Sequence, residues 1–269
     1  MTSPLILGQI SLPFHQAAAA VVARLLRELG HDVMLQEAPH EEMYEQLEKG
    51  AVDLVCSAWL PASHGKYIAH FEDSLEKLSI LYTPYCIWGV PPNAPADLTS
   101  VADLARPEIA SQFRKLIQGI NPGAGISRFS RQMITEYRLD VQGFHFENGT
   151  LDDCTSAYLD ASLAGDFAVL PLWHPQWLHT KTTPRELSDP KGLLGGQDDA
   201  TLVLRKDASA KLSEDGMTLL RNITLGNAAV SELDRAICRD GQKPDQAAAA
   251  WIIENRRLCD RWIEGKSDV

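Results

Sequence analysis

The sequence predicts an α/β protein of two lobes, each built on a mostly parallel sheet flanked by helices. Up to Cys56, short apolar runs alternate with helical patterns in the order β-α-β-α-β, which is typical of parallel strands joined by crossover helices. The 269 residues are 45% hydrophobic, a size that fits one large α/β unit or two lobes. The prolines of Pro91–Pro95 break the pattern and indicate a crossing between lobes. We therefore expect residues 1–90 and 197–269 to form a discontinuous first lobe, and residues 91–196 a second one.

The first five elements have clear boundaries. They are a strand at 5–10, a helix at about 16–29, a strand at 31–36, a short acidic helix at 41–48 and a strand at 51–56. Gly30 ends the first helix as a C-cap. Ala17, Val21 and Leu25 lie roughly on one face of that helix, which predicts the side that packs on the sheet.

The later elements follow from the same patterns. They are an apolar, strand-forming stretch at 79–90, a capped short helix at 100–104, a strand at 115–120, helices at 126–137 and 150–164, a strand at 167–172, a strand at 200–204, and helices from 208 to 263. The strand at 200–204 is expected to return the chain to the first lobe.

Composition excludes several classes of protein. The net charge of -11 and the absence of a basic stripe disfavour nucleic acid as a partner. The 5 cysteines show no metal-ligand spacing, and their odd number argues against a full disulfide framework. No apolar run reaches the ~20 residues that span a membrane. The chain enters a strand at once without a signal segment, so it is cytoplasmic if it is the complete gene product, or extracytoplasmic if a signal was removed.

Two tryptophans each follow a strand and precede a proline. Trp59 stands before Leu60-Pro61, and Trp173 before His174-Pro175. In an open α/β sheet, ligands bind where strands end. Because the face of an indole ring attracts cations, the pair predicts a clamp for a small, positively charged ligand.

Other residues could supply donors to a carboxylate. The turn with Gly123 and Gly125 precedes a helix, whose N-terminal end favours anions. Backbone N–H groups near Ile10 and Ser11 are further candidates, and so is His64, which could equally be a surface cap for the helix that follows it. Phosphate-loop, dinucleotide and serine-hydrolase motifs are absent, and we expect neither a cofactor nor a metal.

Six motifs, in order, carry a resemblance to a known family. They are Leu29-Gly30-His31-Asp32-Val33, Ala58-Trp59-Leu60-Pro61-Ala62-Ser63-His64, Gly119-Ile120-Asn121-Pro122-Gly123-Ala124-Gly125-Ile126, Leu172-Trp173-His174-Pro175, Leu187-Ser188-Asp189-Pro190-Lys191-Gly192 and Ala250-Trp251-Ile252-Ile253-Glu254-Asn255. The chain resembles the glycine betaine/choline-type substrate-binding proteins of ABC importers, a branch of the type II periplasmic binding protein fold.

The resemblance implies two lobes that close on the ligand, with aromatic rings around a quaternary ammonium group. Trp59 and Trp173 match tryptophans of the family's motifs, and Trp88, or with less support Tyr85, falls where another aromatic contributes. The chain departs from the family at the first turn. There Leu12 stands where a tryptophan is frequent, and Phe14 and His15 follow.

These features predict a binding protein rather than an enzyme. It would be a monomer that delivers a betaine- or choline-like solute to an ABC permease outside the cytoplasm. One alternative is a cytoplasmic sensor or stand-alone binding domain on the same fold. The other is an enzyme on that fold, which would need a general acid or base. Only His15, His64 and His174 are candidates for that role, and none has an evident carboxylate partner.

Overall fold

The computed structural model describes residues 3–266 and divides into two compact units. Unit 2 is the continuous segment Tyr85–Gln197, and unit 1 contains the described residues on either side of it. The strand at 85–90, which the sequence placed in the first lobe, thus lies in unit 2. The physical reason is its pairing, since both strands that it contacts belong to that unit.

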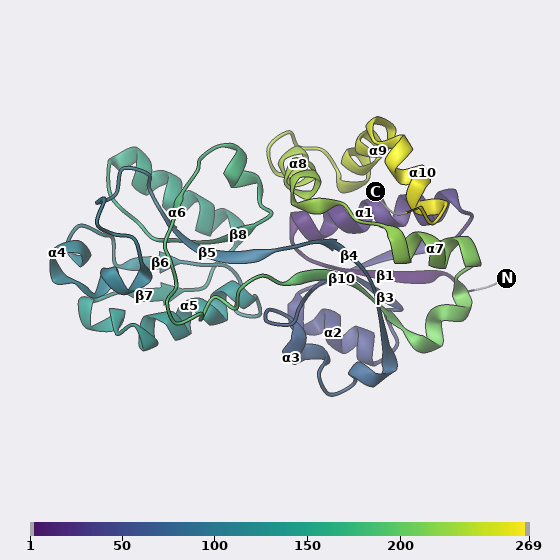
Figure 1. The fold of residues 1–269 in the computed structure, drawn as a ribbon, viewed down its shortest axis with the longest axis horizontal. Coiled ribbons are helices and arrows are strands. Elements are labelled where there is room, and N and C mark those ends of the chain that lie inside the picture. The colour runs from purple at the N-terminus through teal and green to yellow at the C-terminus, as the bar shows by residue number, and fades with distance from the viewer. Residues whose placement is uncertain (1–2, 267–269) are drawn as a thin grey trace. The chain divides into compact units, whose positions relative to one another are not determined.

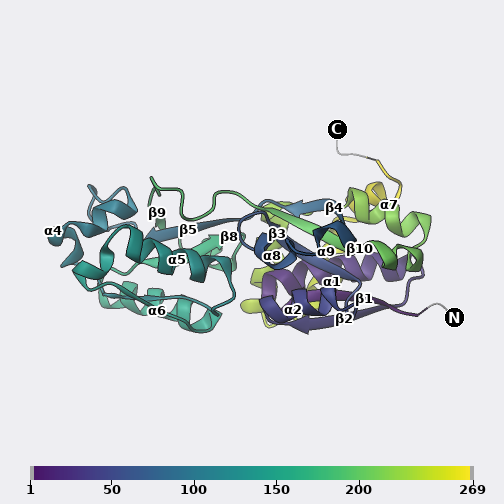
Figure 2. The ribbon, with the colours of Figure 1, turned by 90° about the horizontal axis from the view of Figure 1, so that it is seen from below.

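The sheet of unit 1 has five strands in the order β2-β1-β3-β10-β4. Their bounds are β1 Leu5–Ile10, β2 Val33–Ala38, β3 Leu54–Leu60, β4 Leu75–Tyr82 and β10 Asp199–Arg205. β1 pairs in parallel with β2 and β3, which confirms the predicted β-α-β-α-β unit. β10 runs antiparallel between β3 and β4, so that β2 and β4 form the two edges (Figure 2).

Helices cover both faces of this sheet (Figure 1). They are α1 Pro13–Glu28, α2 His40–Glu48, α3 Gly65–Ile68, α7 Glu214–Asn222, α8 Gly226–Cys238, α9 Pro244–Glu254 and α10 Arg256–Ile263. α1 lies between the sheet and the helices α8 and α9, whereas α2 and α3 lie on the opposite face. Because α1 is covered on its outer side too, Ala17 to Ala20 are all buried. The helix therefore buries more of its surface than the single face that the sequence predicted.

Unit 2 contains a three-stranded sheet in the order β8-β5-β9 and a separate parallel pair. The strands are β5 Tyr85–Val90, β8 Leu170–His174, β9 Arg185–Glu186, β6 Leu116–Gln118 and β7 His145–Glu147. The helices are α4 Pro107–Ala110, α5 Gly125–Glu136 and α6 Leu151–Ala164, and α5 and α6 cover opposite faces of β8 (Figure 1). β5 is antiparallel to both of its neighbours whereas β6 and β7 are parallel, so the strand pairing of unit 2 is mixed and not mostly parallel. Apolar periodicity locates a strand but does not give its direction.

The proline-rich stretch Pro91–Pro95 is not the crossing point, since it lies inside unit 2. The Arg185 guanidinium donates to the carbonyls of Ala94, Pro95 and Leu98 and fixes this stretch against β9. The chain instead crosses between Pro84 and Tyr85, and again between Gln197 and Asp198.

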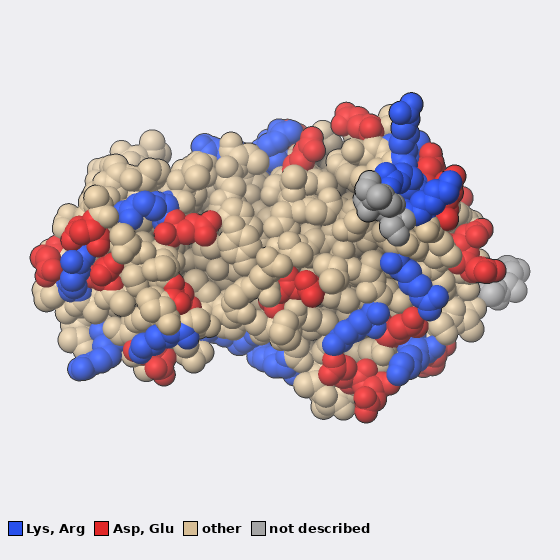
Figure 3. Space-filling view, viewed as in Figure 1, with Lys and Arg blue, Asp and Glu red and all other residues tan. Residues whose placement is uncertain are grey.

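Surface and membrane properties agree with the composition. Lys and Arg side chains are interspersed with Asp and Glu on the face drawn in Figure 3. Among the described residues, the helices are too short or too polar to cross a bilayer. All five cysteines are free thiols.

Candidate functional site

An aromatic cluster surrounds Trp59, the penultimate residue of β3. Its ring centroid lies 5.3 Å from that of Phe14, 5.6 Å from His15 and 6.1 Å from His64. Phe14 and His15 come from the first turn of α1, and His64 directly precedes α3. The indole of Trp59 is only 5% exposed. The strand end that the sequence singled out thus gathers rings from three segments of unit 1.

Hydrogen bonds fix the orientation of this cluster. The Trp59 indole Nε1–H donates to the Tyr82 hydroxyl at 3.0 Å, and the Trp59 backbone N–H donates to His64 Nδ1 at 2.9 Å. The Tyr44 hydroxyl also lies 2.9 Å from His64 Nδ1. His64 is 1% exposed, and its side chain makes no cap hydrogen bond to α3, so its reading as a surface cap is wrong.

The loop after Trp59 is held by a carboxylate. Asp198 accepts hydrogen bonds from the backbone N–H groups of Ala62 at 2.7 Å and Ser63 at 3.1 Å. The Leu60-Pro61 peptide bond is cis, as is His174-Pro175 after the second tryptophan. Asp198 is 3% exposed and comes just before β10, so two distant stretches of sequence meet beside Trp59.

The first turn supplies fewer free donors than the sequence suggested. Ile10 belongs to β1 and pairs with Ala38, and the Ser11 N–H donates to the Ala38 carbonyl at 3.0 Å. The Leu12 N–H donates to the Ile10 carbonyl at 2.7 Å. These bonds complete the sheet end and the turn, so the backbone N–H groups of Ser11 and Leu12 are already occupied within unit 1. Leu12 itself is 6% exposed and packs in the core.

In unit 2, Trp173 and Trp88 lie on the same face of the sheet. Trp173 stands opposite Cys86 and is 1% exposed. Trp88 is 0% exposed, and its indole Nε1–H donates to the Ser130 hydroxyl of α5 at 2.8 Å. The indole of Trp88 therefore links the sheet to α5.

The opposite face of the same sheet carries a stack of three rings. Tyr85 stacks on His174 at 4.6 Å, and His174 stacks on His179 at 3.6 Å. Burial lowers the pKa of His174, and it lowers the pKa of His179 to about 4 with a further contribution from His174. Both imidazoles are thus neutral at pH 7, and His179 Nε2 lies 3.0 Å from the Trp173 carbonyl. A hollow of about 430 Å³ is lined by Tyr85, Cys86, Asp189 and the loop from Gly192 to Gln197.

The glycine turn of unit 2 lies where the sequence placed it. Ala124 is the N-cap of α5, which begins at Gly125, and the first turn of this helix has no acidic residue. The Gly123 carbonyl accepts a hydrogen bond from Arg128 at 2.5 Å. The positive N-terminal end of α5 is therefore not offset by a carboxylate in its first turn, and it favours an anion.

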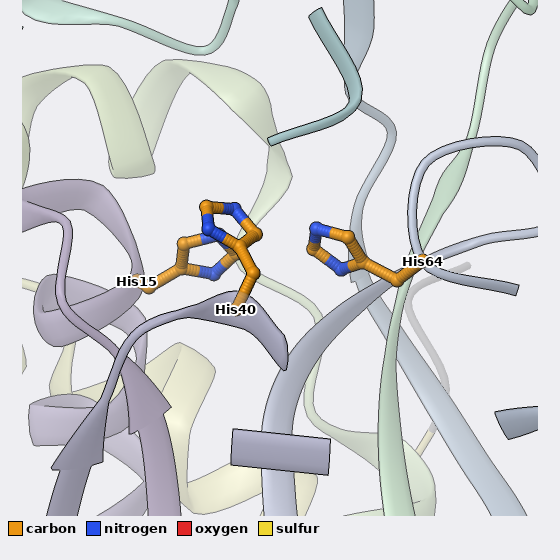
Figure 4. A group of neighbouring side chains, drawn as sticks. All are labelled: His15, His40 and His64. Atoms are coloured by element: carbon orange, nitrogen blue, oxygen red, sulfur yellow. The ribbon is translucent and has the colours of Figure 1, made fainter. Parts of the chain in front are cut away.

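Four residues that contact the aromatic cluster around Trp59 were not predicted from the sequence. His40 opens α2, and its ring centroid is 5.2 Å from that of His64 (Figure 4). The other three make hydrogen bonds: Tyr44 with His64, Ser57 with His15, and Tyr82 with the Trp59 indole. A usable signal existed for His40, because it follows the end of β2 as His15 follows β1 and His64 follows β3.

Residues 3–254 match the protein family described as the substrate-binding domain of an ABC-type glycine betaine transport system, OpuAC. The chain belongs to this family. Members of the OpuAC family are substrate-binding domains and not enzymes, which confirms the prediction of a binding protein.

Individual relatives agree with the assignment to the OpuAC family. The chain is 28% identical over 168 residues to the glycine betaine/carnitine transport binding protein GbuC of Listeria monocytogenes. That match covers 61% of this chain and 54% of GbuC, so the chain spans about half the length of this curated relative.

Solved structures show the same fold. Lactococcal OpuAC, crystallised with glycine betaine, is similar with a TM-score of 0.86 at 23% identity, covering 97% of this chain and 99% of that one. An ABC-transporter choline-binding protein in complex with choline gives a TM-score of 0.84 at 20% identity, covering 98% of this chain and 92% of that one. The type II periplasmic binding protein fold predicted from the sequence is thereby confirmed.

Proposed function

We propose that this protein binds a small quaternary ammonium solute of the betaine type and passes it to an ABC permease. The observation that carries the proposal is family membership over residues 3–254, combined with a Trp-x-Pro sequence at the ends of β3 and β8. A trimethylammonium group has no N–H to donate, so ring faces rather than hydrogen bonds must recognise it. Each cation–π contact contributes about 0.5–2 kcal/mol.

Each unit offers its own contacts in this proposal. Unit 1 supplies Trp59, with Phe14 packed against it and His64 as a donor to a carboxylate. Unit 2 supplies Trp173, with the α5 N-terminus at Gly125 as a second place for a carboxylate, whereas Tyr85 lies on the face of the sheet opposite Trp173. Trp88 is a further ring of unit 2, held through α5 by its bond to Ser130, and the Ser11 N–H has no part in this proposal, because it donates to the Ala38 carbonyl.

We propose further that the protein works outside the cytoplasm as a monomer. The support is the family's description as part of an ABC-type transport system, in which the solute must reach the permease from the outer side. A monomer presents both units to one permease.

The test is tryptophan fluorescence during titration of the unliganded protein with glycine betaine, choline and carnitine. A saturable emission change at micromolar concentration of one of them supports the proposal. Replacing Trp173→Leu keeps an apolar side chain but removes the ring face, so we expect affinity to fall roughly 2- to 30-fold. Trp251→Leu, on α9, is the matched control and should leave affinity unchanged. Absence of a response to all three solutes in a folded protein would contradict the proposed ligand class.

A further inference from the structure

Three side chains on neighbouring strands of unit 1 lie in one row beside the aromatic cluster. Trp59 on β3 pairs with Ala200 on β10, and Ala200 pairs with Tyr82 on β4. Residues directly opposite one another in antiparallel strands project from the same face of the sheet, so Trp59 and Tyr82 flank Ala200 on one face. Ala200 is 0% exposed and has only a methyl group, which leaves room for the Trp59 indole to reach across it. The indole Nε1 thus lies 3.0 Å from the Tyr82 hydroxyl oxygen, with an angle of 86° between the two rings.

This hydrogen bond fixes a torsion that the backbone leaves open. Rotation of an indole about its last side-chain bond has a broad energy minimum, so the fold of β3 alone does not set the plane of the Trp59 ring. A bond at the N–H edge of the indole does set that plane. Trp59 and Tyr82 are 5% and 2% exposed, so bulk water has little access to replace the bond. Because a cation binds the face of an aromatic ring, the Tyr82 hydroxyl determines where Trp59 can receive one.

Tyr82 is itself held by the start of α8. The Leu225 N–H donates to the Leu81 carbonyl at 2.7 Å. The Asn227 side chain accepts from the Thr83 N–H at 3.0 Å and donates to the Thr83 carbonyl at 2.9 Å. β4 is at the edge of the five-stranded sheet, and these bonds take the place of a neighbouring strand on its outer side. They bracket Tyr82, one residue to either side.

The Asn227 amide suits this role because it carries a donor and an acceptor side by side, as a peptide group does. Asn227 is the second residue of α8 and is half-buried. α8 packs on α1 and α9, behind the sheet (Figure 1). The helices therefore fix the end of β4 and with it the place of the Tyr82 phenol.

We propose that Tyr82 and Asn227 are positioning residues for the ligand ring of unit 1. Tyr82 orients Trp59 through its hydroxyl, and Asn227 orients Tyr82 through the backbone of Thr83. Neither residue touches the solute. The inference rests on the proposed function, in which Trp59 contacts the ligand. Its consequence is that the affinity for a cation depends on α8, although none of the cluster residues lies on that helix.

The first experiment reads the orientation of Trp59 without a ligand. In ¹H–¹⁵N NMR spectra of the full chain, which has 6 tryptophans, the Trp59 indole N–H resonance is assigned by its loss in Trp59→Phe. Tyr82→Phe removes the acceptor, so this resonance should move upfield, and Asn227→Ala should move it in the same direction by a smaller amount. Asn222→Ala deletes a comparable side-chain amide bond, to the Thr218 carbonyl, and as the matched control should leave the resonance in place. If either Tyr82→Phe or Asn227→Ala left it in place, the positioning would be overturned.

The second experiment is calorimetric titration of the wild type and the variants with glycine betaine. A misplaced ring loses part of its contact with the cation, so affinity should fall roughly 3- to 10-fold in Tyr82→Phe and about 2- to 5-fold in Asn227→Ala. Asn222→Ala should bind as tightly as the wild type. In the double variant, affinity should fall no further than in Tyr82→Phe alone, because Asn227 acts through the Tyr82 hydroxyl. Losses that multiply, or no loss in Tyr82→Phe, would overturn the positioning.

Failure of the proposed function and failure of this positioning give different results. If the wild type bound no quaternary ammonium solute while the Trp59 resonance moved as expected in both variants, the proposed function would fail, and the positioning of Trp59 would stand. If the wild type and both variants bound glycine betaine equally well, the proposed function would stand, and the positioning would fail.

Discussion

At the scale of single residues, Trp59 does more than offer a ring face. Its backbone N–H donates to His64 Nδ1, and its indole N–H donates to the Tyr82 hydroxyl. Burial raises the pKa of Tyr82, which keeps the phenol protonated while its oxygen accepts the hydrogen bond from Trp59. The cluster therefore depends on hydroxyl groups that a hydrophobic pattern does not reveal.

Tyr82→Phe tests this dependence. The change removes the acceptor of a buried indole N–H, so we expect the free energy of unfolding to fall by about 1–3 kcal/mol in urea denaturation. Tyr85→Phe deletes the same hydroxyl from a partly exposed ring and should cost less than about 0.5 kcal/mol. Similar values for the two variants would show that the Tyr82 hydroxyl has no special role.

At the scale of elements, the sequence located most strands and helices of unit 1 but not the pairings of unit 2. The β-α-β-α-β order and the tryptophan at the end of β3 were readable because apolar periodicity and prolines mark them. The stretch 79–90 looked continuous, yet β4 ends at Tyr82 and β5 begins at Tyr85 in another unit. His40 was missed because a single histidine after a strand is a weak signal, although its place after β2 matches those of His15 after β1 and His64 after β3.

The stack of Tyr85, His174 and His179 should make the free energy of unfolding depend on pH. The folded protein holds the pKa of His179 at about 4, below its ordinary value near 6.5, because burial disfavours the charged ring. The stabilisation by neutral His179 is fully present above about pH 6.5 and is lost as the pH falls toward 4. His179→Gln should therefore reduce the loss of unfolding free energy between pH 7 and pH 5. His145→Gln, at an exposed site of unit 2, should leave that loss as in the wild type. If His179→Gln lost as much unfolding free energy between pH 7 and pH 5 as the wild type, His179 would not be the group responsible.

At the scale of the whole molecule, each unit has its own core, and binding should stabilise the folded chain by mass action. A ligand at 100 times its Kd adds about 2.7 kcal/mol to the free energy of unfolding. For a chain of this size we expect a rise in Tm of roughly 5–10 °C with saturating glycine betaine, measured by scanning calorimetry. Choline at the same concentration should give a smaller rise. Equal shifts from both solutes would mean that the carboxylate adds nothing to binding.

The two chain crossings have a consequence for the architecture as a whole. The Asp198 N–H donates to the Pro84 carbonyl at 2.8 Å, and Tyr85 and Gln197 form a β-bridge. The ends of unit 2 therefore lie about one strand spacing, roughly 5 Å, apart. In topological terms, residues 85–197 are an insertion into a single loop of unit 1. A short turn could replace the entire insertion without stretching the parent sheet, and the excised segment could be grafted between two adjacent strands of another scaffold.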